Sequence, residues 1–193
     1  MKRLFSFFIC MQAISVYAQK VSVDQIESDG RHQIMTTSKV FSIDGTKYSF
    51  CMKIFEDAYY TDWCLLISSF YNIPSSTEVL LKLGNGDLMY LPCNNVHVGK
   101  VTMPGYGITI GSITSISPSR EVDYYSSIYE LSPEKIDKIA EYGIKKIRIS
   151  TGTKYCDKEF SGNPLGKFLV KCRKIIQERL DAPLKKKSLF DDF

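Results

Sequence analysis

The sequence predicts an α+β fold: a mainly antiparallel β-sheet or sandwich, followed by a helix, a strand and a second helix at the C-terminus. Two observations predict this fold. Apolar and polar residues alternate through the first two thirds of the chain, with turn-forming residues between the alternating segments. In the last third, apolar residues recur at spacings of three and four instead, which is the period of an amphipathic helix.

The N-terminus has the order of a secretory signal peptide. Basic residues at positions 2 and 3 precede an apolar run over residues 4–11, and Val16 and Ala18 place acceptable side chains before a cleavage site. The apolar run is much shorter than the roughly 20 residues that span a bilayer. We therefore expect cleavage of residues 1–18, no membrane span, and a protein exported to the periplasm, the cell surface or the medium.

The remainder of the chain predicts one domain. Residues 19–183 show no internal repeat and no low-complexity linker, and a chain of this size can bury on the order of 70% of its unfolded surface. Such a chain needs no metal or disulfide for stability, and no metal or cofactor is expected. Residues 184–193 are expected to form a mobile charged tail. The formal net charge is +4, and removal of the two basic signal residues leaves +2, so nucleic acid is not an expected partner.

The first strands are predicted from alternation. After a polar opening segment, a strand is expected over residues 33–43 and ends at the Asp44-Gly45 turn. Residues 56–61 connect the next strand to another over residues 62–71. The strand before that connection places large apolar residues on one face, namely Tyr48, Phe50, Met52 and Ile54.

The clearest hairpin lies in the middle of the chain. Residues 77–83 and 87–91 flank Gly84-Asn85-Gly86, whose residues accept the positive φ angles of tight hairpin turns. Further strands are expected over residues 96–103, 107–116 and 121–131.

The C-terminal third begins with a complete helix start. Ser132 supplies a capping hydroxyl, Pro133 the first helical position and Glu134 an acid in the first turn. Gly143 can end this helix, and a strand over residues 144–151 follows. The apolar stripe of this first helix consists of Ile136, Ile139 and Ala140.

The second helix carries the strongest periodic signal in the chain. It is expected to start at Asn163-Pro164. Its apolar residues recur at spacings of three and four, namely Leu165, Phe168, Leu169, Cys172, Ile175, Ile176 and Leu180.

Three segments carry a resemblance. Together with the signal, the runs Ile144-Lys145-Lys146-Ile147-Arg148-Ile149, Asp157-Lys158-Glu159-Phe160 and Gly166-Lys167-Phe168-Leu169 resemble a group of uncharacterised secreted proteins of Bacteroidetes. The resemblance covers the signal and the region from about residue 129 to 180, and more weakly the strands before it. It implies export and a shared fold. No activity is assigned to that group, so no functional residue is carried over.

Five cysteines remain after signal cleavage, an odd number in a compartment that permits oxidation. Cys51 and Cys64 lie on consecutive predicted strands and are roughly symmetric about the turn between them, so one disulfide between them is a candidate. The alternative is that all five are small buried hydrophobic residues, as free cysteines often are.

No set of residues identifies a reaction. His32 and His97 stand in no catalytic signature, and no clustered cysteine or histidine spacing indicates a metal site. Ser132 and Lys135 match a serine-x-x-lysine pattern, but the partner motifs of that enzyme class are absent. Acids that the fold could gather into a hydrolase site are numerous, namely Glu56, Asp57, Asp62, Glu121, Asp123, Asp157 and Glu159.

Aromatic residues give the remaining indication of function. Tyr59, Tyr60 and Trp63 cluster at one connection, where flat rings with a polar edge suit a glycan or a protein surface. Strands are also rich in tyrosine for packing reasons alone. The sequence therefore favours a non-catalytic binding or interaction module with a protein or glycan partner. The alternatives are a hydrolase of an envelope polymer or polysaccharide, using carboxylates or a cysteine, and a structural protein that self-associates.

Overall fold

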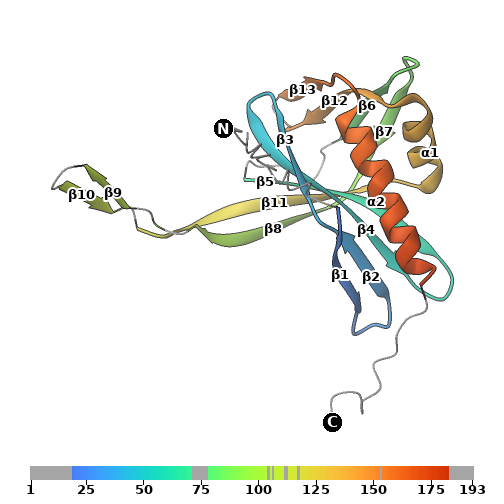
Figure 1. The fold of residues 1–193 in the computed structure, drawn as a ribbon, viewed down its shortest axis with the longest axis horizontal. Helices are drawn as coiled ribbons and strands as arrows, with labels where there is room; N and C mark the ends of the chain where they lie inside the picture. Colours follow the sequence, from blue (N-terminus) through green and yellow to red (C-terminus); the bar gives the residue numbers. More distant parts are fainter. Residues whose placement is uncertain are drawn as a thin grey trace, which may run out of the picture.

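The computed structural model describes residues 19–70, 78–103, 105, 107–110, 113–116, 118–152 and 154–182. The predicted signal peptide and the predicted tail over residues 184–193 lie outside these residues. The described chain has an α+β fold in which every strand pair is antiparallel and two helices follow in the C-terminal third (Figure 1). None of its helices is long and apolar enough to cross a membrane.

The large sheet forms most of the body of the molecule. Its strand order is β1-β2-β4-β5-β11-β8, and β3 pairs with the part of β4 that β2 leaves free. Alternation with period two places one side chain in two toward the core. The strands are β1 (Val21–Ile26), β2 (His32–Thr36), β3 (Lys39–Ile43), β4 (Thr46–Glu56), β5 (Thr61–Ser69), β8 (Cys93–Met103) and β11 (Arg120–Glu130).

The small sheet has four strands in the order β13-β12-β6-β7. It combines the predicted central hairpin with two strands from the C-terminal third: β6 (Val79–Leu83), β7 (Leu88–Leu91), β12 (Ile144–Ser150) and β13 (Tyr155–Glu159). A separate hairpin of β9 (Gly107–Ile110) and β10 (Ile113–Ile116) lies at the far end of the β8–β11 pair (Figure 1).

Both predicted helices form where their caps indicate. In α1 (Pro133–Tyr142), the Ser132 hydroxyl accepts a hydrogen bond from the Lys135 backbone N–H, and Gly143 follows with a positive φ of 70°. In α2 (Pro164–Leu180), the Asn163 side chain accepts a hydrogen bond from the Gly166 backbone N–H. These side chains satisfy backbone donors that a helix start leaves unpaired.

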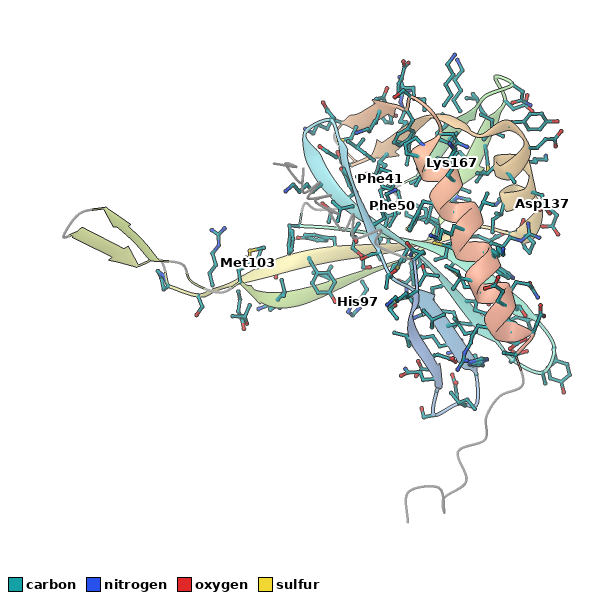
Figure 2. All side chains as sticks on the ribbon, in the orientation of Figure 1. Phe41, Phe50, His97, Met103, Asp137 and Lys167 are labelled. Carbon is teal, nitrogen blue, oxygen red and sulfur yellow. The ribbon has the colours of Figure 1, made fainter. Side chains whose placement is uncertain are left out.

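The core lies between the inner faces of the two sheets and α2. On β4, alternation is confirmed, because the four residues predicted to share a face are all buried. Phe41 of β3 packs edge-to-face on Phe50 of β4, with ring centroids 5.4 Å apart, and on Phe168 of α2 (Figure 2). The apolar face of α2 thus covers the inner face of the large sheet (Figure 1).

The β8–β11 pair extends away from the body as an arm (Figure 1). β5 ends at Ser69, opposite Tyr125 of β11. Beyond that point β8 is the only described strand that pairs with β11, so that residues 99–103 and 120–124 form a two-stranded ribbon. We call these residues the arm. His97 lies at its base and Met103 toward its outer end (Figure 2).

Several predicted boundaries were wrong. The strand expected over residues 33–43 is divided into β2 and β3. The two pair with different parts of β4, β2 with residues 53–56 and β3 with residues 46–50. The strand expected over residues 107–116 is the hairpin of β9 and β10. Two strands, β1 and β13, were missed because each is short and rich in polar residues. On α1, Ala140 is exposed, and the buried stripe consists of Ile136 and Ile139.

Candidate functional site

The predicted aromatic cluster does not form a single surface. Tyr59 is 94% exposed and Tyr60 is also exposed, both in the turn between β4 and β5, where their backbone N–H groups donate to the Asp57 carboxylate. Trp63 is only 7% exposed, because alternation places it on the inner face of β5 with Leu65. Trp63 therefore belongs to the core, and of the three predicted aromatic residues Tyr59 and Tyr60 are the two that a ligand at this turn could contact.

All five described cysteines are free thiols. Cys51 lies opposite Leu66 and Cys64 opposite Lys53, so the two predicted disulfide partners are offset by two residues along the β4–β5 pair. Burial raises the pKa of Cys51 to about 12 and that of Cys64 to about 11. A thiol with a raised pKa is a poor nucleophile at neutral pH, so these cysteines favour the packing interpretation.

His32 makes contacts that the sequence did not indicate. Its Nε2 lies 2.7 Å from Asp24 Oδ1 on β1, and its Nδ1 lies 3.4 Å from Glu56 Oε2 on β4. Arg179, near the end of α2, also donates to the Asp24 carboxylate. Burial acts to raise the pKa of Asp24, but the hydrogen bonds from His32 and Arg179 outweigh it and lower the pKa. We call these four residues the ion-pair cluster.

The ion-pair cluster joins elements rather than assembling a reaction centre. It connects three strands of the large sheet to the C-terminal end of α2. The partners of His32 among the described residues are carboxylates, whereas nucleophilic catalysis by cysteine requires a thiol beside the imidazole. Within the same part of the chain, no group of three or more histidine, cysteine or acidic side chains is arranged to hold a metal ion.

The side chains on the outer face of the small sheet are at least partly exposed and are arranged in a regular pattern. Side chains directly opposite on neighbouring strands form two rows that run across β7, β6, β12 and β13. The first row is Tyr90, Leu80, Arg148 and Asp157, and the second is Leu88, Lys82, Lys146 and Glu159. The first row passes from a tyrosine and a leucine through one cation to an acid, and the second passes from a leucine through two cations to an acid. We call this surface the open face.

Exposed rings and apolar groups lie at both edges of the open face. On β7, Leu88 is 64% and Tyr90 45% exposed, values that burial in a core would not allow. On β13, Tyr155 is 65% exposed and its ring lies 5.2 Å from the Arg148 guanidinium carbon, close enough for a cation–π contact. These two edge strands are separated by three strand spacings, roughly 14 Å.

The centre of the open face is positively charged. Lys82, Lys145, Lys146 and Arg148 contribute four positive charges, and the two acids of β13 contribute two negative ones. Asp157 accepts hydrogen bonds from Arg148 and Lys146, whereas Lys82 and Lys145 have no ion-pair partner among the described residues. An open depression of about 400 Å³ lies over this centre, lined by Leu80, Lys82, Leu88, Lys145, Lys146, Arg148 and Glu159.

The pKa of Asp157 shows the effect of its cationic neighbours. Hydrogen bonds from Arg148, and then from Lys146, hold the pKa of Asp157 far below its usual value, although burial acts in the opposite direction. The charged form of Asp157 is therefore stabilised by its two cationic partners. Lys82 and Lys145 pair with no acid among the described residues, so their charges are available to a ligand carboxylate.

Sequence reasoning did not find the open face. Its residues come from two hairpins separated by more than 50 residues, and they become neighbours only through the pairing of β6 with β12. The signal that was present in the sequence was the alternation of lysine and arginine with isoleucine along β12.

Comparisons of the chain with protein-family models, with curated proteins and with solved structures find no match.

Proposed function

We propose that this protein is an exported, non-catalytic binding module whose open face takes an acidic glycan. The observation that carries the proposal is the pair of cross-strand rows, in which exposed Leu88 and Tyr90 lie beside a cationic depression. A saccharide that carries carboxylates offers both matching features. Its sugar rings have apolar C–H faces for tyrosine, and its carboxylates match lysine and arginine.

The charge pattern favours a glycan over a nucleic acid. Asp157 and Glu159 form the β13 side of the open face and repel phosphates and carboxylates alike, so this side favours a ligand that also presents neutral hydroxyl groups. Glu159 has no ion-pair partner among the described residues, so its oxygens are available to accept hydrogen bonds from sugar hydroxyls. The formal net charge of the whole chain, +4, also supplies little long-range attraction for nucleic acid.

The state of the buried thiols supports binding rather than hydrolysis. Cys172 contacts the Thr36 hydroxyl inside the core, and burial raises the pKa of Cys172 to about 11. Asp157 on the open face has a lowered pKa, whereas a general acid in glycoside hydrolysis needs a raised one. Hydrolysis would therefore need groups other than these to act as acid or nucleophile.

The experiment is an isothermal titration calorimetry measurement in which oligogalacturonate is added to the purified protein at low and at physiological ionic strength. Methyl-esterified oligogalacturonate has the same sugar rings without the charge, and we expect it to bind at least tenfold more weakly. Oligo-dT serves as the anionic polymer of the other class. Because salt screens exposed charges, binding should weaken as ionic strength rises.

Variants locate the interaction. Lys82→Glu reverses one charge at the centre of the open face and should weaken oligogalacturonate binding at least tenfold. Lys167→Glu makes the same charge change on the exposed side of α2 and serves as the matched control (Figure 2). Equal losses in both variants, or tighter binding of oligo-dT than of oligogalacturonate, would contradict the proposal. Mass spectrometry of the mixtures adds one more test, because shorter saccharides would show that the protein is a hydrolase.

A further inference from the structure

The outermost strand of the large sheet is unusually long. β8 ends the strand order, and none of the described strands pairs with its outer side. It has 11 residues, whereas β1, β3, β7 and β13 at the other edges have between four and six. An unpaired edge presents a row of backbone N–H and C=O groups that can template the addition of another strand.

β8 also lacks the features that usually prevent edge pairing. It contains no proline, and Lys100 is its only formally charged side chain. Its one irregularity is a register shift near the body, and from Asn95 outward the pairing with β11 is regular. Val98 is 54% exposed and Val101 is also exposed, although valine in a sheet is normally covered.

The two-stranded arm would be stabilised if another strand paired with this edge. Over residues 99–103, β11 is the only described strand beside β8, and the arm extends beyond the core (Figure 1). Two-stranded ribbons are marginally stable in water, whereas a third and a fourth strand supply the missing hydrogen bonds and side-chain contacts.

An axis at Val98 brings two exposed valines together and keeps the lysines of the two copies apart. In an antiparallel pair related by a two-fold axis at Val98, that residue faces its own symmetry mate and Lys100 faces Val96 of the other copy. An axis at Lys100 would oppose two lysines directly, which is unfavourable. In its own chain Lys100 Nζ lies 3.7 Å from a Glu121 carboxylate oxygen, so its charge is already partly compensated.

We infer that β8 pairs antiparallel with β8 of a second copy of this chain, with the two-fold axis at Val98, and that the two large sheets become one continuous sheet. The contact uses the same strand on both copies, which gives a closed dimer instead of an open chain of molecules. It lies on the large sheet, so it stands whether or not the open face binds a glycan. A strand from a different protein would not be restricted to this self-complementary register.

Sedimentation velocity across a range of concentrations tests the inference on the purified protein. The expected result is a monomer–dimer equilibrium. Val98→Lys places two lysines face to face at the axis and should raise the dissociation constant of the dimer at least tenfold, as should Val98→Glu. An equimolar mixture of the two variants opposes a lysine to a glutamate and should restore dimers. This rescue separates loss of pairing from loss of folding.

Val101→Lys is the matched control, because in this register residue 101 faces Asn95 of the other copy and adds no like-charge contact. It should leave the dissociation constant within about threefold of that of the unaltered protein. The inference is overturned by a protein that stays monomeric at every concentration. It is also overturned by a dimer that Val98→Lys does not weaken, by failure of the mixed variants to associate, or by an equal loss in Val101→Lys.

Discussion

The guanidinium of Arg148 donates two hydrogen bonds to the carboxylate of Asp157, from Nε to Oδ1 and from Nη2 to Oδ2, each 2.7 Å long. Lys146 Nζ lies 2.9 Å from the same carboxylate. A planar guanidinium fits a carboxylate in this two-pronged way better than it fits any other side chain. Asp157 therefore pairs with two cations of the open face that would otherwise be available to a ligand.

Asp157→Asn should raise the affinity for oligogalacturonate and lower stability at the same time. The substitution releases Arg148 and Lys146, and one additional unit charge about 6 Å from a ligand carboxylate contributes on the order of 0.7 kcal/mol in water. We expect at least about threefold tighter binding at low ionic strength. Loss of a partly exposed ion pair should cost about 1 kcal/mol of unfolding free energy. Calorimetric titration and urea unfolding measure the two effects.

Asp123→Asn is the control for this prediction. It changes the net charge of the chain by the same amount, but Asp123 is an exposed residue of the arm and lies outside the open face. Its affinity should stay within about twofold of that of the unaltered protein. If Asp157→Asn binds more weakly, Asp157 positions Arg148 for the ligand rather than competing with it.

Tyr90→Ala separates the open face from the predicted site at the β4–β5 turn. Tyr90 is exposed beside the cationic depression, and removing its ring should weaken oligogalacturonate binding about tenfold, with little effect on stability. Tyr59→Ala removes an even more exposed ring in the turn that the sequence favoured. If Tyr59→Ala weakens binding and Tyr90→Ala does not, the ligand site lies at that turn.

Much of the fold was predictable because its signals are local. The caps at Ser132 and Asn163 and the alternation around Phe50 depend on residues within one or two turns of chain, so helix starts and buried faces could be read directly. The same local reading misplaced Trp63, because the sequence puts it close to the exposed Tyr59 and Tyr60. In the structure β5 begins at Thr61, so Trp63 follows the alternation of that strand and points inward.

The open face and the ion-pair cluster depend on non-local pairing. Lys82 and Lys146 become opposite neighbours only in the β6–β12 register, and Asp24 reaches Arg179 only because α2 crosses the large sheet. Single-sequence periodicity identifies which side of a strand is apolar but not which strand lies next to it. For this reason the cationic rows could not be predicted.

Thiol accessibility should follow burial. Burial raises the pKa of Cys51, Cys64, Cys172 and Cys93. The first three are buried, whereas Cys93 is only half-buried. At pH 8 a thiol reagent should therefore react first with Cys93 in the folded protein and reach the others only on unfolding. Peptide mapping after brief alkylation identifies the site. Rapid labelling of Cys51 would show that this part of the large sheet opens readily, and a mass two units lower without reductant would show a disulfide.

The ion-pair cluster should make stability depend on acid. The pKa of Asp24 is lowered below 3.8 in the folded protein, where burial opposes the hydrogen bonds from His32 and Arg179 that lower it. The folded state therefore binds fewer protons at this site than the unfolded state. The resulting stabilisation is complete above the unfolded pKa and is lost as the pH falls below about 4, through the folded pKa.

Asp24→Asn removes this contribution and should lower the unfolding free energy by about 2 kcal/mol at pH 7, the usual size of a charge-assisted hydrogen-bond loss. The difference between this variant and the unaltered protein should shrink as the pH falls from 5 to 2, because protonation also abolishes the charge of Asp24. Asp62→Asn, at an exposed position at the start of β5, should cost less than about 0.5 kcal/mol. Urea unfolding at several pH values measures all three proteins. A difference for Asp24→Asn that stays constant across this range would mean that the side chain stabilises α2 by packing instead of by its charge.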